Sequence, residues 1–162
     1  MKIKLFVFLC LCFSFISCAT APVPRQVQTA FPIDKAFDKV WQAVIETFAE
    51  LNLPILNKEI GPGVISTDWI NLENKDNTNG YCDCGKLGIM AIEDLRHGRF
   101  EVYIKKVGDS SCELKVNTEF ELIWRSIPPV YTIGGEATFT KKCVSTGILE
   151  AEIFKRVSEK TK

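Results

Sequence analysis

The chain has 162 residues, of which 46% are hydrophobic and 25% are charged, values typical of a globular protein. This composition excludes a disordered tail, a collagen-like chain and a protein with several membrane spans. The 20 basic side chains are balanced by 20 acidic ones, so the chain lacks the basic surplus of a nucleic-acid-binding protein. We therefore expect no nucleic-acid partner.

Residues 1–17 have the features of an export signal. A short cationic start precedes an apolar run over residues 5–16, which is too short to span a bilayer comfortably. The run ends in Phe-Ile-Ser-Cys, which resembles the bacterial lipobox, where the cysteine is acylated and becomes the new N-terminus. We therefore predict a signal peptide over residues 1–17 and a lipid on Cys18. The alternative is an ordinary secretory signal with an incidental cysteine.

The lipobox resemblance also implies a location. Several acyl chains on Cys18 anchor a protein stably, because each buried CH₂ contributes about 0.8 kcal/mol. Ala19 follows the cysteine, and in lipoproteins of Gram-negative bacteria the absence of Asp there favours the outer membrane. Residues 18–29 contain two prolines and no periodicity, which predicts a lipidated flexible tether. We expect a lipid anchor in the outer membrane, with the domain facing the periplasm.

Four cysteines lie outside the signal peptide and the lipid site: Cys82, Cys84, Cys112 and Cys143. In an oxidising compartment such cysteines form disulfides. We expect Cys82 and Cys84 each to bond Cys112 or Cys143 in an order left open, since a bridge between the first two would close a very tight ring. The alternative is a metal site formed by Cys82 and Cys84 with Cys112, Cys143 or His97, but the sequence has no second close ligand pair to complete it. We therefore predict no metal and no cofactor.

Residues 30–162 are predicted to form one domain, which opens with a short strand over residues 29–33. Asp34 is a suitable N-cap for the helix that follows, and Asn52 and Pro54 end it. Apolar side chains recur in it at three- and four-residue steps, which predicts about four turns with one apolar face. These residues are Phe37, Val40, Trp41, Val44, Ile45, Phe48 and Leu51.

The middle of the chain has the pattern of antiparallel strands. Residues 55–60 and 64–70 are separated by Gly-Pro-Gly, which predicts a hairpin. Residues 99–107 and 113–123 alternate apolar and polar side chains, so we expect two antiparallel strands with one face in water. Ser145 is expected to cap a closing helix, and the segregation of helices from strands predicts the α+β class. The inner stripe of that helix is Leu149, Ile153, Phe154 and Val157.

Two stretches carry a family resemblance. Residues 34–41 (DKAFDKVW) and 63–69 (GVISTDW) are similar to the helix-grip domains of the BamC (NlpB) lipoproteins. The resemblance implies a two-layer helix-grip fold, with an antiparallel sheet packed against a long N-terminal helix and a C-terminal helix. Those lipoproteins are accessory subunits of the outer-membrane β-barrel assembly machinery, which implies an envelope protein as partner. They have no catalytic residues that would carry over.

No pattern for catalysis accompanies the single histidine, His97. It lies in a charged segment before a predicted strand, so we interpret it as a solvated turn residue and expect no enzymatic activity. Residues 71–88 form a long polar insertion, which we interpret as a loop held by disulfides, with a functional loop as the alternative.

Residues 122–131 combine aromatic, Arg and Pro side chains, a composition typical of interface anchors. Our hypothesis is that they contact a partner protein, and the alternative is an ordinary lid over the sheet. The residues concerned are Trp124, Arg125, Ile127 and Tyr131.

Together these observations predict a membrane-anchored binding or scaffolding module of the cell envelope. The first alternative is a carrier that holds a lipid or other apolar ligand in a cavity between Trp41, Phe48 and the sheet. The second is a thiol redox protein using Cys82 and Cys84, which requires one of these thiols to be accessible and to have a lowered pKa.

Overall fold

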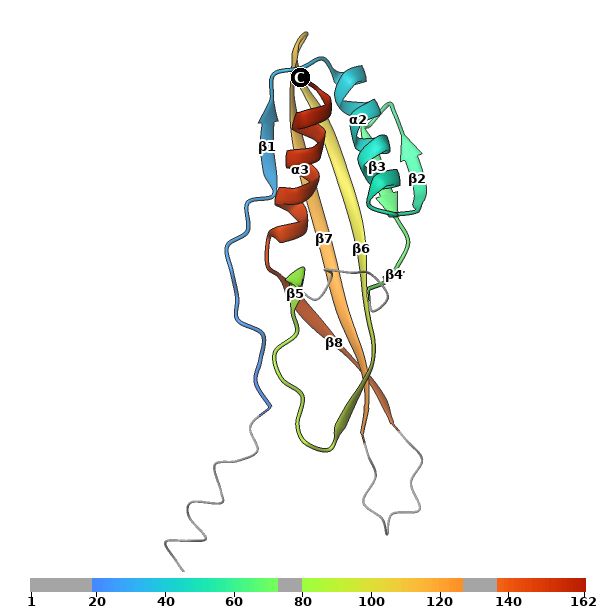
Figure 1. Ribbon diagram of the computed structural model, residues 1–162, viewed down its shortest axis with the longest axis vertical. Helices are drawn as coiled ribbons and strands as arrows, with labels where there is room; N and C mark the ends of the chain where they lie inside the picture. The colour runs from blue at the N-terminus through green and yellow to red at the C-terminus, as the bar shows by residue number, and fades with distance from the viewer. Residues whose placement is uncertain (1–18, 73–79, 127–136) are drawn as a thin grey trace, which may run out of the picture.

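One antiparallel sheet dominates the structure (Figure 1). The computed structural model describes residues 19–72, 80–126 and 137–162. Its elements are β1 (Ala30–Ile33), α2 (Phe37–Glu50), β2 (Ile55–Glu59), β3 (Val64–Thr67), β4 (Ile70–Asn71), β5 (Cys82–Asp83), β6 (Ala91–Gly108), β7 (Ser111–Ser126), β8 (Thr138–Ser145) and α3 (Ile148–Lys160). The strand order is β2-β3-β6-β7-β8-β5, while β1 pairs with β7 and β4 pairs with β6.

Two long strands, β6 and β7, form the centre of this sheet. β6 has 18 residues and β7 has 16, and they pair from Ala91 opposite Ser126 to Gly108 opposite Ser111. The other edge of β7 is shared, because β1 pairs with its first half and β8 with its second half. The lower part of this sheet in Figure 1 therefore extends well beyond both helices.

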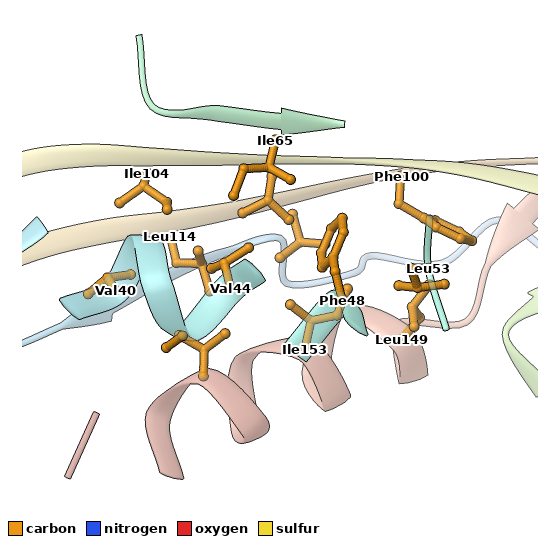
Figure 2. Close-up of a cluster of buried hydrophobic side chains, with 14 of the residues drawn as sticks. Val40, Val44, Phe48, Leu53, Ile65, Phe100, Ile104, Leu114, Leu149 and Ile153 are labelled. Atoms are coloured by element: carbon orange, nitrogen blue, oxygen red, sulfur yellow. The ribbon is translucent and has the colours of Figure 1, made fainter. Parts of the chain in front are cut away.

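Both helices lie side by side on one face of the sheet (Figure 1). Val40, Val44 and Phe48 recur at four-residue steps in α2 and have no exposed surface. Figure 2 shows them beside Ile65 and Leu114 of the sheet, which are also fully buried. At these positions the layer between helix and sheet is a filled core, close-packed as protein interiors are.

The closing helix α3 buries the predicted stripe. Leu149, Ile153 and Val157 are almost completely inaccessible to solvent. Phe154 stacks on Phe31 of β1, with ring centroids 4.4 Å apart, so α3 also fastens the first strand. None of the helices among the described residues is long and apolar enough to span a bilayer.

The predicted fold class, an α+β two-layer helix-grip domain with a long N-terminal helix, is wrong. Of the described residues, 48% lie in strands and 22% in helices. α2 has 14 residues and α3 has 13, so neither is a long helix enclosed by the sheet. The physical reason is the length of the β6–β7 hairpin, of which the two helices cover only part of one face.

Several predicted boundaries also differ from the structure. Ala36 occupies the N-cap of α2 without a side-chain hydrogen bond, so Asp34 does not cap it. The N-cap of α3 is Gly147, whose N–H donates to the Ser145 hydroxyl oxygen at 3.0 Å. Ser145 therefore supports the start of the helix from two residues before the cap.

Residues 19–29, predicted as a tether, run alongside the domain and hydrogen-bond to it. Thr20 forms a backbone bridge with Lys86, and the Val23 N–H donates to a carboxylate oxygen of Asp83 at 3.2 Å. Near β1, the Val116 N–H donates to the Thr29 carbonyl oxygen at 2.8 Å. We call the end of the molecule where residues 19–23, 85–92 and 138–141 lie the tether end.

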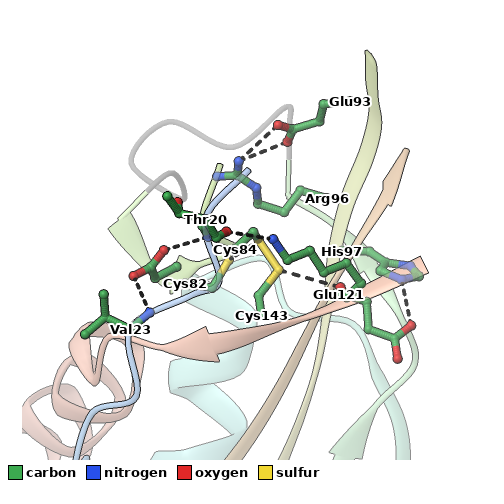
Figure 3. The surroundings of a disulfide bond; sticks show 12 residues. Thr20, Val23, Cys82, Cys84, Glu93, Arg96, His97, Glu121 and Cys143 are labelled. Atoms are coloured by element: carbon green, nitrogen blue, oxygen red, sulfur yellow. Dashed lines mark hydrogen bonds and ion pairs between the residues drawn. A yellow bond between two sulfur atoms is a disulfide. The ribbon is translucent and has the colours of Figure 1, made fainter. Parts of the chain in front are cut away.

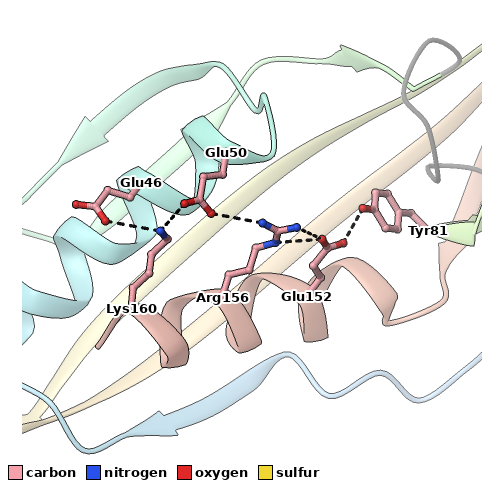
Figure 4. Close-up of polar contacts among 6 residues, drawn as sticks. All are labelled: Glu46, Glu50, Tyr81, Glu152, Arg156 and Lys160. Carbon is pink, nitrogen blue, oxygen red and sulfur yellow. Dashed lines mark hydrogen bonds and ion pairs between the residues drawn. The ribbon is translucent and has the colours of Figure 1, made fainter. Parts of the chain in front are cut away.

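A polar network joins the two helices on their outer side (Figure 4). Arg156 of α3 lies between Glu152 and Glu50 of α2, at 2.9 and 3.4 Å. Lys160 contacts Glu50 as well, and Tyr81 donates its hydroxyl proton to Glu152 at 2.8 Å. The hydrogen bond from Lys160, and after it the contact with Arg156, lower the pKa of Glu50. Because these groups are exposed, we expect the network to orient the helices more than to stabilise them.

The phenol of Tyr81 provides a test of this network. Burial and the hydrogen bond to Glu152 raise its pKa from 10.0 to about 12. The folded state therefore holds the phenolic proton more tightly than the unfolded state, and this stabilisation is complete below pH 10 and lost as pH rises toward 12. Phenolate absorbance should show one tyrosine titrating near pH 12, and Tyr81→Phe should remove that step. A wild-type titration complete by pH 11 would contradict the contact.

Candidate functional site

The helix-free face of the sheet carries a groove, which we define by two neighbouring hollows. The first has a volume of about 810 Å³ and lies between the β2–β3 turn and strands β6 and β7, and at one end it reaches Phe37 and Asp38 at the start of α2. Ile60 and Pro62 of the turn line it together with Tyr103. The second, of about 460 Å³, shares Asn117 with the first and reaches Leu56. Because the two hollows share Asn117, we treat them as one groove.

Alternation along β6 and β7 positions the groove residues. Ile104 and Leu114 are buried beneath the helices, so their neighbours Tyr103 and Lys115 project from the opposite face. Tyr103 and Lys115 are directly paired in the β6–β7 register. The strands therefore hold these two side chains together on the groove floor.

Gly63 places the wall of the groove. Its φ is +71°, and an added Cβ would lie 2.2 Å from the Ile104 carbonyl oxygen. Its own carbonyl oxygen accepts a hydrogen bond from the Ile104 N–H at 2.8 Å. Only glycine combines this conformation with so close an approach. The β2–β3 turn, with Ile60 and Pro62, can therefore lie directly against β6.

Aromatic and arginine side chains continue along the same face. Trp69 stacks on His97 with ring centroids 4.3 Å apart, and the Arg99 guanidinium lies 5.2 Å from the Trp69 ring centroid. Arg99 also forms an ion pair with Glu119 at 2.8 Å. Trp, Tyr and Arg are the side chains that most often dominate binding energy at protein interfaces. The face thus presents fixed anchors for a binding partner.

The charges of the larger hollow are mainly basic. Lys105, Lys106 and Lys115 line it, against the carboxylates of Asp38 and Glu113. The second hollow adds Arg99 against Glu101 and Glu119, so across the whole groove four basic side chains are balanced by four acidic ones.

Tyr103 supplies a neutral hydroxyl to the same hollow. A hydrogen bond to Glu101 and the charge of that carboxylate raise the pKa of Tyr103. The phenol therefore remains protonated at neutral pH and presents a polar group beside the lysines.

One disulfide joins β8 to the segment after β5 (Figure 3). Cys84 bonds Cys143, which lies 59 residues further along the chain. Cys82 and Cys112 are buried free thiols. The structure therefore contains one of the two expected bonds. Cys82 and Cys112 do not pair, because Cys82 lies opposite Ser145 of β8 whereas Cys112 lies opposite Ile33 of β1.

The free thiol of Cys82 lies close to this disulfide. Its sulfur is 3.9 Å from that of Cys84, and the sulfurs of Cys82, Cys84 and Cys143 all lie within 4.8 Å of one another. Two of these three sulfurs are bonded to each other, so this cluster offers a metal only one thiol. Burial raises the pKa of Cys82 and so disfavours the reactive thiolate. The redox alternative requires an accessible thiol with a lowered pKa, whereas Cys82 is buried and its pKa is raised.

Thiol reactivity tests this arrangement of cysteines. In the folded mature chain neither Cys82 nor Cys112 should react with a thiol reagent, because both are buried and burial raises both pKa values. After unfolding without reductant, both should react. If four thiols reacted, the Cys84–Cys143 bond would be absent, and if none reacted, Cys82 and Cys112 would also be bonded.

Of the four residues predicted to contact a partner, the structure describes Trp124 and Arg125. Trp124 stacks on Phe139 with centroids 4.5 Å apart, and Arg125 forms an ion pair with Asp94 at 3.0 Å. Ile127 and Tyr131 lie outside the described residues. The same holds for Cys18, the predicted lipid site.

The only histidine lies in a different environment from the predicted one. His97 belongs to β6, and its side chain is only 15% exposed. It stacks on Trp69 and faces Glu121, with 3.4 Å between Nε2 and the carboxylate oxygen. The prediction of a solvated turn residue is wrong, because β6 begins before the expected strand and includes this position.

The long polar insertion, residues 71–88, is partly structured. It contains β5, which pairs with β8, and Cys84 of the disulfide. Residues 73–79 lie outside the described part of the chain.

A comparison with protein-family models and with curated protein sequences found no match.

Proposed function

We propose that this chain is a lipid-anchored lipoprotein of the outer membrane that acts as a binding module on its periplasmic side. Its site is the groove on the helix-free face, and its partner is an envelope protein that inserts an extended segment with an apolar side chain. The observation that carries this proposal is the groove itself. Tyr103 and the lysines Lys105 and Lys115 form one hollow, and Arg99 continues it beside Trp69.

The geometry favours this module over a carrier of apolar ligands. The proposed carrier cavity would lie between Trp41, Phe48 and the sheet, but Phe48 is fully buried and Trp41 is only 9% exposed. The groove on the other face is open and lined by charged side chains, whereas sites for apolar ligands are enclosed and mostly apolar. An open groove with fixed aromatic and basic groups suits a segment of protein.

Co-purification from detergent-solubilised envelopes tests the proposal. A tagged wild-type chain should retain an envelope protein through repeated washing, identified by mass spectrometry. Tyr103→Ser removes an aromatic anchor that is 38% exposed, so it should leave the fold intact and deplete that protein about tenfold or more. Lys155→Ser, on the exposed side of α3, is the matched control and should retain it.

The outcomes separate the groove from other surfaces. Equal retention by Tyr103→Ser and wild type would refute the groove as the site. Loss with Trp124→Ser alone would instead support the hypothesis that Trp124, Arg125, Ile127 and Tyr131 contact the partner. If the retained protein is a subunit of the β-barrel assembly machinery, the resemblance of residues 34–41 and 63–69 extends to role.

A further inference from the structure

We propose that the tether end is a membrane-contacting surface, which rests on the headgroups of the periplasmic leaflet of the bilayer that holds the lipid anchor. This inference rests on the proposed lipid anchor and adds an orientation to it. The occupant of the surface is the lipid bilayer, and the β6–β7 hairpin would project away from it.

The first observation is where the chain leaves the domain. Ala19 and Thr20 directly follow Cys18 in the sequence, and Thr20 is fixed to the tether end. The Thr20 N–H donates to the Lys86 carbonyl oxygen, and the Lys86 N–H donates to the Thr20 carbonyl oxygen, both at 3.2 Å. Lys141 of β8 adds a contact from its Nζ to the same Thr20 oxygen. A lipid on Cys18 would therefore lie within a few residues of this surface.

Gly85 allows the backbone of Thr20 to pack closely against the segment after β5. Its φ is +66°, and an added Cβ would lie only 2.2 Å from the Thr20 carbonyl oxygen. The backbone of Thr20 therefore lies against a position that only glycine can occupy. Asp83 holds the next residues, since it accepts a hydrogen bond from the Val23 N–H and forms an ion pair with Arg25.

The second observation is a set of exposed apolar side chains at the same end. Ile89 is 76% exposed and Met90 is 50% exposed, and they lie in the segment between β5 and β6. Ile92 and Phe139, at the starts of β6 and β8, are 40% and 43% exposed. Exposed apolar groups gathered at one end of a protein mark an interaction site. Here the predicted anchor supplies the bilayer as the nearest apolar partner.

Polar groups at this end suit the lipid headgroup region. Lys86 and Lys141 flank Thr20, and lysines near an anionic bilayer contribute about 1 kcal/mol each. Trp124, stacked on Phe139, has the amphipathic ring that concentrates at membrane interfaces. A bilayer surface therefore fits this end of the molecule, where the exposed apolar side chains, the Trp124 indole and the two lysines lie close to the predicted lipid anchor.

The length of β6 makes the orientation measurable. Its 18 residues span on the order of 55 Å at about 3.3 Å per residue. Val107 lies near the far end of this strand and is 67% exposed, so it matches Ile89 in exposure but not in position. A probe at residue 89 should touch the bilayer, and a probe at residue 107 should stay far from it.

Fluorescence quenching by lipids tests the proposal in the complete, lipidated chain. A fluorescent amino acid replaces Ile89 or Val107, and each protein is placed in vesicles of phosphatidylethanolamine and phosphatidylglycerol that contain a nitroxide-labelled lipid. We expect severalfold stronger quenching at residue 89 than at residue 107. Thr20→Pro removes the Thr20 N–H and hydroxyl that bind Lys86, so it should reduce quenching at residue 89 without releasing the protein from the vesicles.

Flotation of the same vesicles separates the possible failures. If the chain does not float with the vesicles, the lipid anchor is wrong, and the orientation fails with it. If it floats and residues 89 and 107 are quenched equally, or residue 89 is not quenched, the anchor stands and the membrane-contacting surface is wrong.

Discussion

Replacing Phe48 with alanine is expected to lower the free energy of unfolding by about 3–5 kcal/mol. Phe48 is fully buried between α2 and the sheet, beside Ile65 and Leu114. The substitution removes the transfer free energy of the ring and leaves a cavity that the long strands cannot close. Urea unfolding monitored by circular dichroism should show a much lower midpoint with an unchanged slope.

Leu56→Ala is the matched control for this substitution. Leu56 lies in β2 and is 68% exposed, so its truncation should change stability by less than about 0.5 kcal/mol. If Phe48→Ala cost no more than Leu56→Ala, α2 would not pack against the sheet as described.

Removing the disulfide is the second substitution with a large expected effect. A chain with Cys84→Ala and Cys143→Ala should lose about 2–4 kcal/mol of unfolding free energy. The bond joins residues 59 apart in sequence, so its loss frees a long loop in the unfolded chain and raises its conformational entropy. Denaturation with and without reductant gives the measurement, because reductant should destabilise the wild type and leave the double variant unchanged.

Cys82→Ala controls for the identity of the bonded pair. Cys82 is a free thiol, so the Cys82→Ala chain should keep a reductant-sensitive transition. If that sensitivity disappeared, Cys82 would be one of the bonded cysteines and the Cys84–Cys143 assignment would be wrong.

The elements that local patterns determine could be predicted from the sequence. The apolar stripe of α2 depends only on residues three and four positions apart, so Val40, Val44 and Phe48 indicated both the helix and its buried face. Alternation likewise indicated the second half of β6 and the middle of β7. In both cases one face packs against the core, so apolar residues recur along the sequence with the period of the helix or strand.

The elements outside the core could not be predicted in this way. β8 reads TFTKKCVS and has no buried residue, so burial imposes no alternation on it. The first seven residues of β6, AIEDLRH, extend beyond the helices and likewise include no buried residue. The fold class was therefore wrong, because these segments lengthen the sheet beyond what the core requires.

The candidate groove depends on strand register, which the sequence does not encode locally. Tyr103 and Lys115 become neighbours only when β6 and β7 pair as they do, and Trp69 reaches Arg99 only through the short strands that precede β6. The choice between Cys82 and Cys84 as partner of Cys143 has the same origin. The sequence supplied the residue types, and long-range pairing determines which of them meet.

The proposed location and the membrane-contacting surface both depend on the lipid anchor, which intact mass spectrometry of the mature protein from envelopes would reveal. We predict a chain that begins at Cys18 and is heavier than residues 18–162 by the mass of its acyl groups. Digestion with trypsin should assign this excess mass to the N-terminal peptide, which ends at Arg25. A mature chain that begins at another residue, or one that begins at Cys18 without acyl groups, would show that the chain is not lipid-anchored at Cys18.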